Sequence, residues 1–90
     1  MSELSKELTV VNKLGIHARP AASIVQKMLR FESEVFFIFD GNRINAKSIM
    51  GLLTLAATQG TRIEISVKGD DAEEAMRAVE QLFATGFGES

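Results

Sequence analysis

The apolar and polar positions along the chain recur with two different periods, and these predict alternating strands and helices. Residues 61–68 alternate strictly, as on a strand with one buried face. The apolar members of that face are Ile63, Ile65 and Val67. Residues 34–39 are rich in valine, isoleucine and phenylalanine and predict another strand. Residues 5–12 are β-prone and predict the strand that comes first in the chain.

Two segments carry apolar residues at the spacing of an amphipathic helix. In residues 19–30 the stripe consists of Ala21, Val25, Met28 and Leu29. In the segment before Gly86 the buried face consists of Ala72, Ala75, Met76, Val79, Leu82 and Phe83. Pro20 belongs only in a first helical turn, because it lacks an N–H and fixes φ. The first helix should therefore start next to His17. Another helix is predicted over residues 48–57, ending before Gly60.

Turn and cap signals complete the order of elements. Asp40-Gly41 predicts a hairpin whose return strand covers residues 43–45. Asp70 or Asp71 can cap the last helix, where Glu74 completes a capping box with Asp71. The predicted order is β-α-β-β-α-β-α, an α+β fold. Alternating strand faces favour one antiparallel sheet with the helices on one side.

The strand over residues 34–39 leaves one question open. If Val35, Phe37 and Phe39 face the helices, alternation sends Phe36 and Ile38 to the open side of the sheet. Scattered surface apolar residues are common and need no function. The alternative is a contact patch for self-association or for a partner.

Composition narrows the function classes. The length of 90 residues suits a single domain over 1–90, and an apolar share of 46% argues against disorder. The chain has no cysteine and one histidine, which excludes disulfides, thiolate chemistry and multi-histidine metal sites. A net charge of −2 gives no general attraction to nucleic acid. No run suits a secretory signal or membrane insertion, so we expect a cytoplasmic protein.

The one histidine lies where an anion would bind. His17 directly precedes the predicted helix start, where backbone N–H groups lack partners and the helix dipole is positive. Ala18 cannot cap those groups with its side chain. A neutral imidazole is a nucleophile near physiological pH. A lone histidine is often only a surface residue, but this position favours a phosphoryl acceptor.

Arg19 adds charge and paired N–H donors beside His17. Gly15 allows a close turn just before the histidine. Taken alone, Arg19 could be a solvated first-turn side chain and Gly15 an ordinary strand-to-helix turn. Together with His17 they are typical of an anion site.

Two segments carry a resemblance to a known family. GIHARPA, at residues 15–21, closely resembles the active-site motif of the histidine-containing phosphocarriers (HPr) of the bacterial phosphoenolpyruvate-dependent phosphotransferase system. NAKSIMGL, at residues 45–52, is similar to that family's regulatory-serine segment. Length and element order also match, so the resemblance covers essentially the whole chain.

The resemblance implies an open-faced β-sandwich, in which a four-stranded antiparallel sheet carries three helices on one face. It also implies that phosphorylated enzyme I phosphorylates His17 on Nδ1 and that His17 passes the group to IIA proteins or domains, as in sugar uptake. Arg19 would assist the transfer, and the amides after His17, beginning at Ala18, would help to hold the phosphate. The family keeps no bound cofactor and no metal.

Further residues take expected roles from the resemblance. Ser48 corresponds to the serine that a dedicated kinase phosphorylates in many bacteria, although a serine there can be only a helix cap. Ile49, Met50 and Leu53 would form the apolar docking surface, although core burial is the usual explanation for such residues. Charge placement adds Lys27, which on the first predicted helix could belong to a basic rim that steers an acidic partner. Leu52, Leu55 and Ala56 are assigned to the core. A transcriptional regulator is a further partner in the family, and a monomer is expected.

Departures from the family pattern leave alternatives open. Some members carry a serine shortly before the histidine, and here Asn12 is the polar residue that could contact phosphate instead. A nitrogen-related carrier would share most of these features. A non-catalytic regulatory binding module, using Ile49 and Met50, is the alternative from another class. The presence of His17 argues against the family's regulatory branch, which lacks that histidine.

Overall fold

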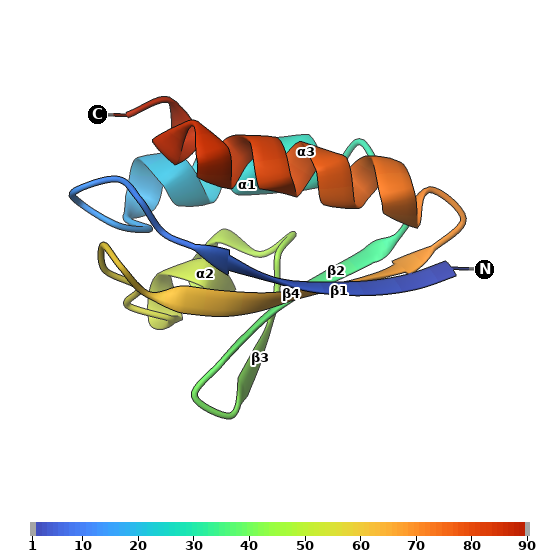
Figure 1. The fold of residues 1–90 in the computed structure, drawn as a ribbon, viewed down its shortest axis with the longest axis horizontal. Helices are drawn as coiled ribbons and strands as arrows, with labels where there is room; N and C mark the ends of the chain where they lie inside the picture. Colours follow the sequence, from blue (N-terminus) through green and yellow to red (C-terminus); the bar gives the residue numbers. More distant parts are fainter. Residues whose placement is uncertain (1, 90) are drawn as a thin grey trace.

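The computed structural model describes residues 2–89, and its elements follow the predicted order (Figure 1). The chain forms β1 (Ser2–Thr9), α1 (Ala18–Met28), β2 (Glu34–Phe39), β3 (Asn42–Asn45), α2 (Ile49–Thr54), β4 (Arg62–Gly69) and α3 (Ala72–Ala84), and then a short turn of 3-10 helix, η1 (Gly86–Gly88). The predicted α+β class is therefore confirmed.

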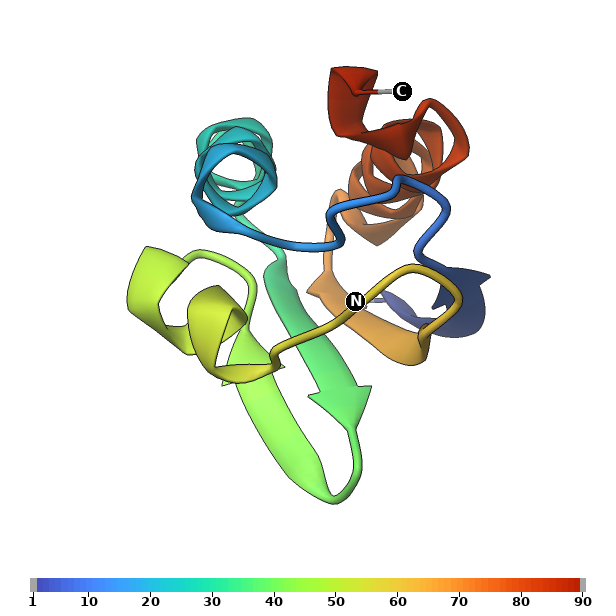
Figure 2. The same cartoon turned by 90° about the vertical axis from the view of Figure 1, so that its left-hand side faces the viewer.

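The four strands make one antiparallel sheet in the order β1-β4-β2-β3. Figure 2 shows the helices together on one side of this sheet, with α1 beside α3 and α2 below α1. Among residues 2–89, no helix covers the other side of the sheet, as the open-faced sandwich requires. In the described part of the chain, none of the helices combines the length and apolar character needed to cross a membrane.

The core lies between the sheet and the helices. The sheet contributes the alternating residues of β4 together with Val35 and Phe37 of β2, all fully buried. Phe83 of α3 packs edge-on against Phe37, with ring centroids 5.7 Å apart, and against Phe87, at 5.0 Å. Such aromatic contacts fix the position of α3 and of the turn that follows it.

The Asp40-Gly41 hairpin is confirmed by its backbone. Both residues have positive φ, 53° at Asp40 and 80° at Gly41. Two central residues of positive φ match the twist of the flanking strands. The hairpin places β3 beside β2, with Phe37 opposite Ile44.

Two predicted elements have bounds that were wrong by three residues at one end or both, and the predicted helix over 19–30 ends two residues earlier, at Met28. The first strand is Ser2–Thr9 rather than 5–12, because the chain leaves β4 after Thr9 to turn toward α1. The second helix is Ile49–Thr54 rather than 48–57. Ala56 has a φ of 49°, which no helix accommodates, while Leu55 and Ala57 on either side are buried. Apolar residues in this loop therefore extend the helical pattern in sequence beyond the end of the helix.

Three predicted core residues are exposed. Leu29 is 63% exposed because it follows the last residue of α1. Phe39 ends β2 next to the hairpin, and Ala56 turns outward. Leu82 is only half-buried, whereas Ile24 of α1, absent from the predicted stripe, is fully buried.

The open face of the sheet bears Phe36 and Ile38, as the alternation predicted. Both are half-buried rather than fully exposed. The guanidinium carbon of Arg43 lies 4.1 Å from the centre of the Phe36 ring, so a cation covers part of this apolar surface.

The predicted capping box at α3 was also wrong. Asp71 is the residue that precedes the helix, but its side chain makes no capping hydrogen bond. Its carboxylate instead accepts the backbone N–H groups of Glu32 and Ser33 and the Ser33 hydroxyl. These bonds lower the pKa of Asp71, the Ser33 hydroxyl most of all. Asp71 thus ties α3 to the start of β2.

Candidate functional site

The start of α1 leaves backbone donors unused. His17 is the N-cap residue, with extended backbone at φ −90° and ψ −166°, and its side chain makes no capping hydrogen bond. The first helical bond runs from the Ala21 N–H to the His17 carbonyl, 3.0 Å. Pro20 has no N–H. Within residues 2–89, the N–H groups of Ala18 and Arg19 therefore have no acceptor.

The charge at this helix start favours an anion. The first turn of α1 contains no acidic residue, and Arg19 in that turn is exposed. The helix dipole adds partial positive charge at the same end. Sequence reasoning thus placed His17, Ala18 and Arg19 correctly at one helix start.

A close backbone contact fixes the chain just before His17. Gly15 has a φ of 69°, and a Cβ there would lie 2.1 Å from the Ala57 carbonyl oxygen. The next amide, of Ile16, donates to that same oxygen at 2.9 Å. The loop after α2 therefore holds the segment that carries the histidine, and only glycine fits at the point of contact.

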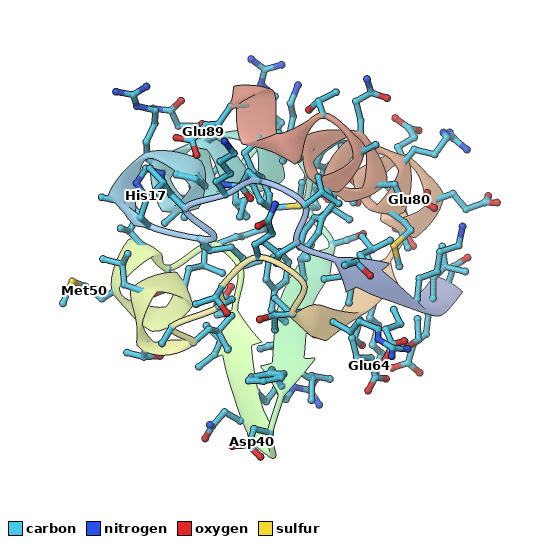
Figure 3. All side chains as sticks on the ribbon, turned by 60° about the vertical axis from the view of Figure 1, so that its left-hand side comes forward. His17, Asp40, Met50, Glu64, Glu80 and Glu89 are labelled. Atoms are coloured by element: carbon cyan, nitrogen blue, oxygen red, sulfur yellow. The ribbon has the colours of Figure 1, made fainter. Side chains whose placement is uncertain are left out.

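Glu89 holds one nitrogen of the His17 ring. The imidazole Nε2 lies 2.9 Å from Oε2 and 3.0 Å from Oε1 of the Glu89 carboxylate (Figure 3). The His17 side chain is 36% exposed and that of Glu89 only 14%. Nδ1 makes no hydrogen bond to any described residue. The ring is thus held at one nitrogen and open at the other.

Asn12 holds the carboxylate in turn. Its Nδ2 donates to the Gly15 carbonyl at 2.8 Å and to Oε1 of Glu89 at 2.9 Å, and the residue is 2% exposed. Both N–H groups of the Asn12 amide are used in these bonds, so in this structure Asn12 holds Glu89, and its expected contact with phosphate stays a prediction. The His17 hydrogen bond chiefly lowers the pKa of Glu89, with smaller contributions from Asn12 and Arg19, against a rise from burial.

The turn after α3 brings Glu89 to His17, across 72 positions of sequence. Gly86, Phe87 and Gly88 all have positive φ, at 61°, 59° and 79°, which reverses the chain. Phe87 is buried and anchors this turn. Sequence reasoning missed Glu89, because no periodicity or motif marks an acidic residue in this position.

The start of α2 is built differently from that of α1. Ser48 is its N-cap residue, and the hydroxyl oxygen accepts the Gly51 N–H at 3.0 Å. This confirms Ser48 as a helix cap, half-buried at the surface.

Comparison with known proteins identifies the family of this chain. A family model, described as the PTS HPr component phosphorylation site, matches residues 4–85. The phosphocarrier protein HPr of Xylella fastidiosa (strain Temecula1 / ATCC 700964) is 49% identical over 96% of this chain and 97% of its own length. The chain belongs to the HPr family. It is thereby a member of the phosphocarriers of the phosphotransferase system.

Solved HPr structures share the fold. HPr-C-His from Thermoanaerobacter tengcongensis has a TM-score of 0.88 at 42% identity, covering 100% of this chain and 99% of that one. A structure described as an HPr dimer from the same organism has a TM-score of 0.77 at 44% identity, covering 93% and 99%. The open-faced sandwich is therefore an HPr fold.

An exposed apolar surface lies on α2, which packs against α1. Ile49, Met50 and Leu53 are exposed, Met50 at 74%, whereas Leu52 and Leu55 are buried. Figure 3 shows His17 and Met50 on the same side of the molecule. Lys27 lies farther along α1 and is half-buried. Among residues 2–89, no three histidine, cysteine, aspartate or glutamate side chains are grouped to hold a metal ion.

Proposed function

We propose that this protein accepts a phosphoryl group on His17 from phosphorylated enzyme I and passes it to IIA proteins or domains in the cytoplasm. The observation that carries the proposal is the start of α1. There an accessible imidazole and two unused backbone N–H groups lie in the same turn as Arg19, and that turn contains no acidic residue.

The transfer follows from the free nitrogen of the ring. The lone pair of His17 Nδ1 attacks phosphorus, and an N–P bond forms. The bond between phosphorus and its donor atom on enzyme I breaks, and its electron pair stays with that donor. Delivery to IIA repeats the step in the opposite sense, with His17 as the leaving group.

The neighbours of His17 receive the charge of the phosphoryl oxygens. The amides of Ala18 and Arg19 donate hydrogen bonds, and the Arg19 guanidinium supplies positive charge. These donors are already oriented by the helix, so little reorganisation accompanies the transfer.

The test is phosphorylation by enzyme I from the same organism with labelled phosphoenolpyruvate. The protein should gain an acid-labile label, which a IIA acceptor then removes, and His17→Ala should gain none. An unlabelled protein, with an enzyme I that labels another carrier, would favour the non-catalytic binding module. Label that survives His17→Ala would place the acceptor elsewhere.

We further propose that Ser48 is a regulatory phosphorylation site for an HPr kinase/phosphorylase. The Ser48 hydroxyl is half-buried at the surface, and its oxygen accepts from Gly51 without committing its proton. A phosphate there would add negative charge beside the docking surface. Incubation with the kinase and ATP should add one phosphate by intact mass, and Ser48→Ala should add none. An unmodified natural protein would exclude this regulation by that kinase.

The docking surface for enzyme I and IIA is proposed to consist of Ile49, Met50 and Leu53, with Lys27 at its rim. The exposure of these apolar side chains supports this, with Met50 on the same side of the molecule as His17 (Figure 3), and methionine adapts to different partners. Met50→Glu should slow transfer without changing the fold. Phe39→Glu, at the hairpin end of β2, is the matched control and should transfer at the natural rate. Equal rates for both variants would remove Met50 from the surface.

We propose that the carrier works as a monomer. Phe36 and Ile38 are half-buried, and Arg43 covers part of Phe36. Sedimentation across a concentration series should show one species of monomer mass. A dimer that Phe36→Ser dissociates would show instead that the open face of the sheet is an interface.

A further inference from the structure

The contact between Glu89 and His17 involves one ring nitrogen and both carboxylate oxygens. An ionised carboxylate can only accept hydrogen bonds. The pKa of Glu89 is lowered, so its carboxylate is ionised at neutral pH. The hydrogen of this contact therefore belongs to Nε2 of His17. In the neutral ring, the proton on Nε2 leaves the lone pair on Nδ1.

The carboxylate is itself held in place. Asn12 is buried, and its two neighbours, the Gly15 carbonyl and the Glu89 carboxylate, can only accept hydrogen bonds. Its amide NH₂ group must therefore face them and donate to both. The turn with Phe87 fixes the backbone on the other side. An exposed surface ion pair would not have these supports. Glu89 is thus oriented toward His17 by two independent parts of the structure.

We propose that Glu89 is a positioning residue that keeps His17 in the Nε2–H tautomer and balances the charge that develops on the ring during phosphoryl transfer. This inference rests on the proposed function of His17. It goes beyond that function by assigning the group that selects the reacting nitrogen.

Charge balance follows from the bonds that form. When neutral Nδ1 attacks phosphorus, the ring keeps the proton on Nε2 and becomes a phosphoimidazolium with positive charge. The Glu89 carboxylate, 2.9 Å from Nε2, meets that charge. A carboxylate acts in this way on the histidine of a serine-protease triad, where it holds the tautomer and stabilises the imidazolium.

The same carboxylate would repel a phosphoryl group if the two met directly. Glu89 contacts Nε2, however, whereas the phosphoryl group would enter at Nδ1. Arg19 and the free amides lie at the helix start, where they would supply donors to the incoming charge. The ring thus separates the carboxylate from the phosphoryl oxygens, with its positive charge between them.

The direct test is the tautomer of His17, measured from the nitrogen-15 shifts of its ring at a pH where the ring is neutral. The natural protein should show Nε2 protonated and Nδ1 bare, with no detectable second tautomer. Glu89→Ala should show a mixture of both tautomers, and Glu89→Gln a smaller change, because the amide oxygen can still accept from Nε2. Glu73→Gln, an exposed residue of α3, makes the same charge change elsewhere and should leave the spectrum unaltered.

Transfer rates test the charge balance. Glu89→Gln keeps a hydrogen-bond acceptor for Nε2 but removes its negative charge. We therefore expect this variant to accept the phosphoryl group from enzyme I about tenfold more slowly. Glu73→Gln should react at the natural rate. Because the tautomer is read without enzyme I, an unlabelled natural protein with the expected tautomer would defeat the proposed function and not this structural assignment.

Two results would overturn the inference. The first is a mixture of tautomers in the natural protein, or an unchanged ring spectrum in Glu89→Ala. The second is an altered tautomer with an unchanged transfer rate, which would remove the charge-balancing role. In both cases normal labelling of His17 by enzyme I would leave the proposed function standing.

Discussion

The starts of α1 and α2 differ in how they treat the backbone N–H groups that have no partner within the helix. At α2 the Ser48 hydroxyl accepts the Gly51 N–H, so the helix supplies its own cap. At α1 the His17 side chain accepts nothing from the first turn, and its ring is held by Glu89 instead. The uncapped start keeps donors for a ligand, at a cost in stability that the capped start avoids.

The start of α3 shows that a helix start without a side-chain cap does not by itself favour an anion. Asp71 leaves that helix uncapped, but Glu73 and Glu74 lie in its first turn. Their negative charge interacts favourably with the helix dipole and disfavours a further anion. The anion site proposed at α1 therefore depends on three features together: free amides, Arg19 and a first turn without acidic residues.

Converting the start of α1 into a capped one should have the largest effect on function, because phosphoryl transfer is lost altogether. His17→Ser removes the nucleophile and supplies a hydroxyl that can cap the helix. We expect complete loss of acid-labile label from enzyme I, together with a free energy of unfolding about 1 kcal/mol higher than that of His17→Ala. Urea denaturation of both variants measures the difference. Equal stability would mean that the start of α1 cannot accept a serine cap.

The backbone contact before His17 gives the next largest effect. Gly15→Ala places a Cβ against the Ala57 carbonyl at a positive φ, so the free energy of unfolding should fall by about 3 kcal/mol. Gly41→Ala is the matched control, since it also has positive φ but no atom within 4 Å of the added Cβ. It should lose only about 1 kcal/mol. Equal losses would show that the contact with Ala57 adds nothing.

Removing the cap of α2 should have a smaller effect. Ser48→Ala leaves the Gly51 N–H without its acceptor and should lower the free energy of unfolding by about 1 kcal/mol. Ser48→Asp keeps an acceptor at the same place and should recover most of that loss. Chemical denaturation of the natural protein and the two variants measures these differences in the free energy of unfolding. If Ser48→Asp were as unstable as Ser48→Ala, the hydroxyl would not be acting as a cap.

The smallest effect is expected at α3, and it depends on pH. Hydrogen bonds from Ser33 and Glu32 lower the pKa of Asp71 below its ordinary value of 3.8. The stabilisation is therefore present above pH 3.8 and is lost as the pH falls through the lower folded-state pKa. The difference in free energy of unfolding between the natural protein and Asp71→Asn should stay constant above pH 3.8 and shrink as the pH falls below 3.8. Asp70→Asn, at an exposed neighbour, should show no such change.

The elements that could be predicted from the sequence are those whose signal is local. The alternation in β4 indicated the correct buried face, and Asp40-Gly41 indicated the hairpin, because each depends on neighbouring residues alone. Leu29 and Phe39 were misjudged because both lie at the end of an element. The apolar spacing continues in the sequence up to these two residues, but at the end of an element the rest of the fold no longer covers their side chains.

The residues of the candidate site also divide into those that a local sequence signal marks and those that depend on contacts between distant segments. Pro20 marks a first helical turn, and this local signal was enough to place His17 and Arg19 at the helix start. Asn12 was recognised as a polar residue near the site, but its two acceptors could not be known, since one of them belongs to Glu89. Contacts between distant segments depend on the whole fold, and a single sequence gives no signal for them.

The distance in sequence between His17 and Glu89 has a consequence for biosynthesis. A ribosome makes the chain from its N-terminus, so the histidine is synthesised long before the carboxylate that holds it, 72 positions later. The strand pairing of β1 with β4 likewise waits for residues 62–69. Long-range pairings of this kind slow folding. A nascent chain would thus carry the nucleophile without its orienting partner until Glu89 has been made.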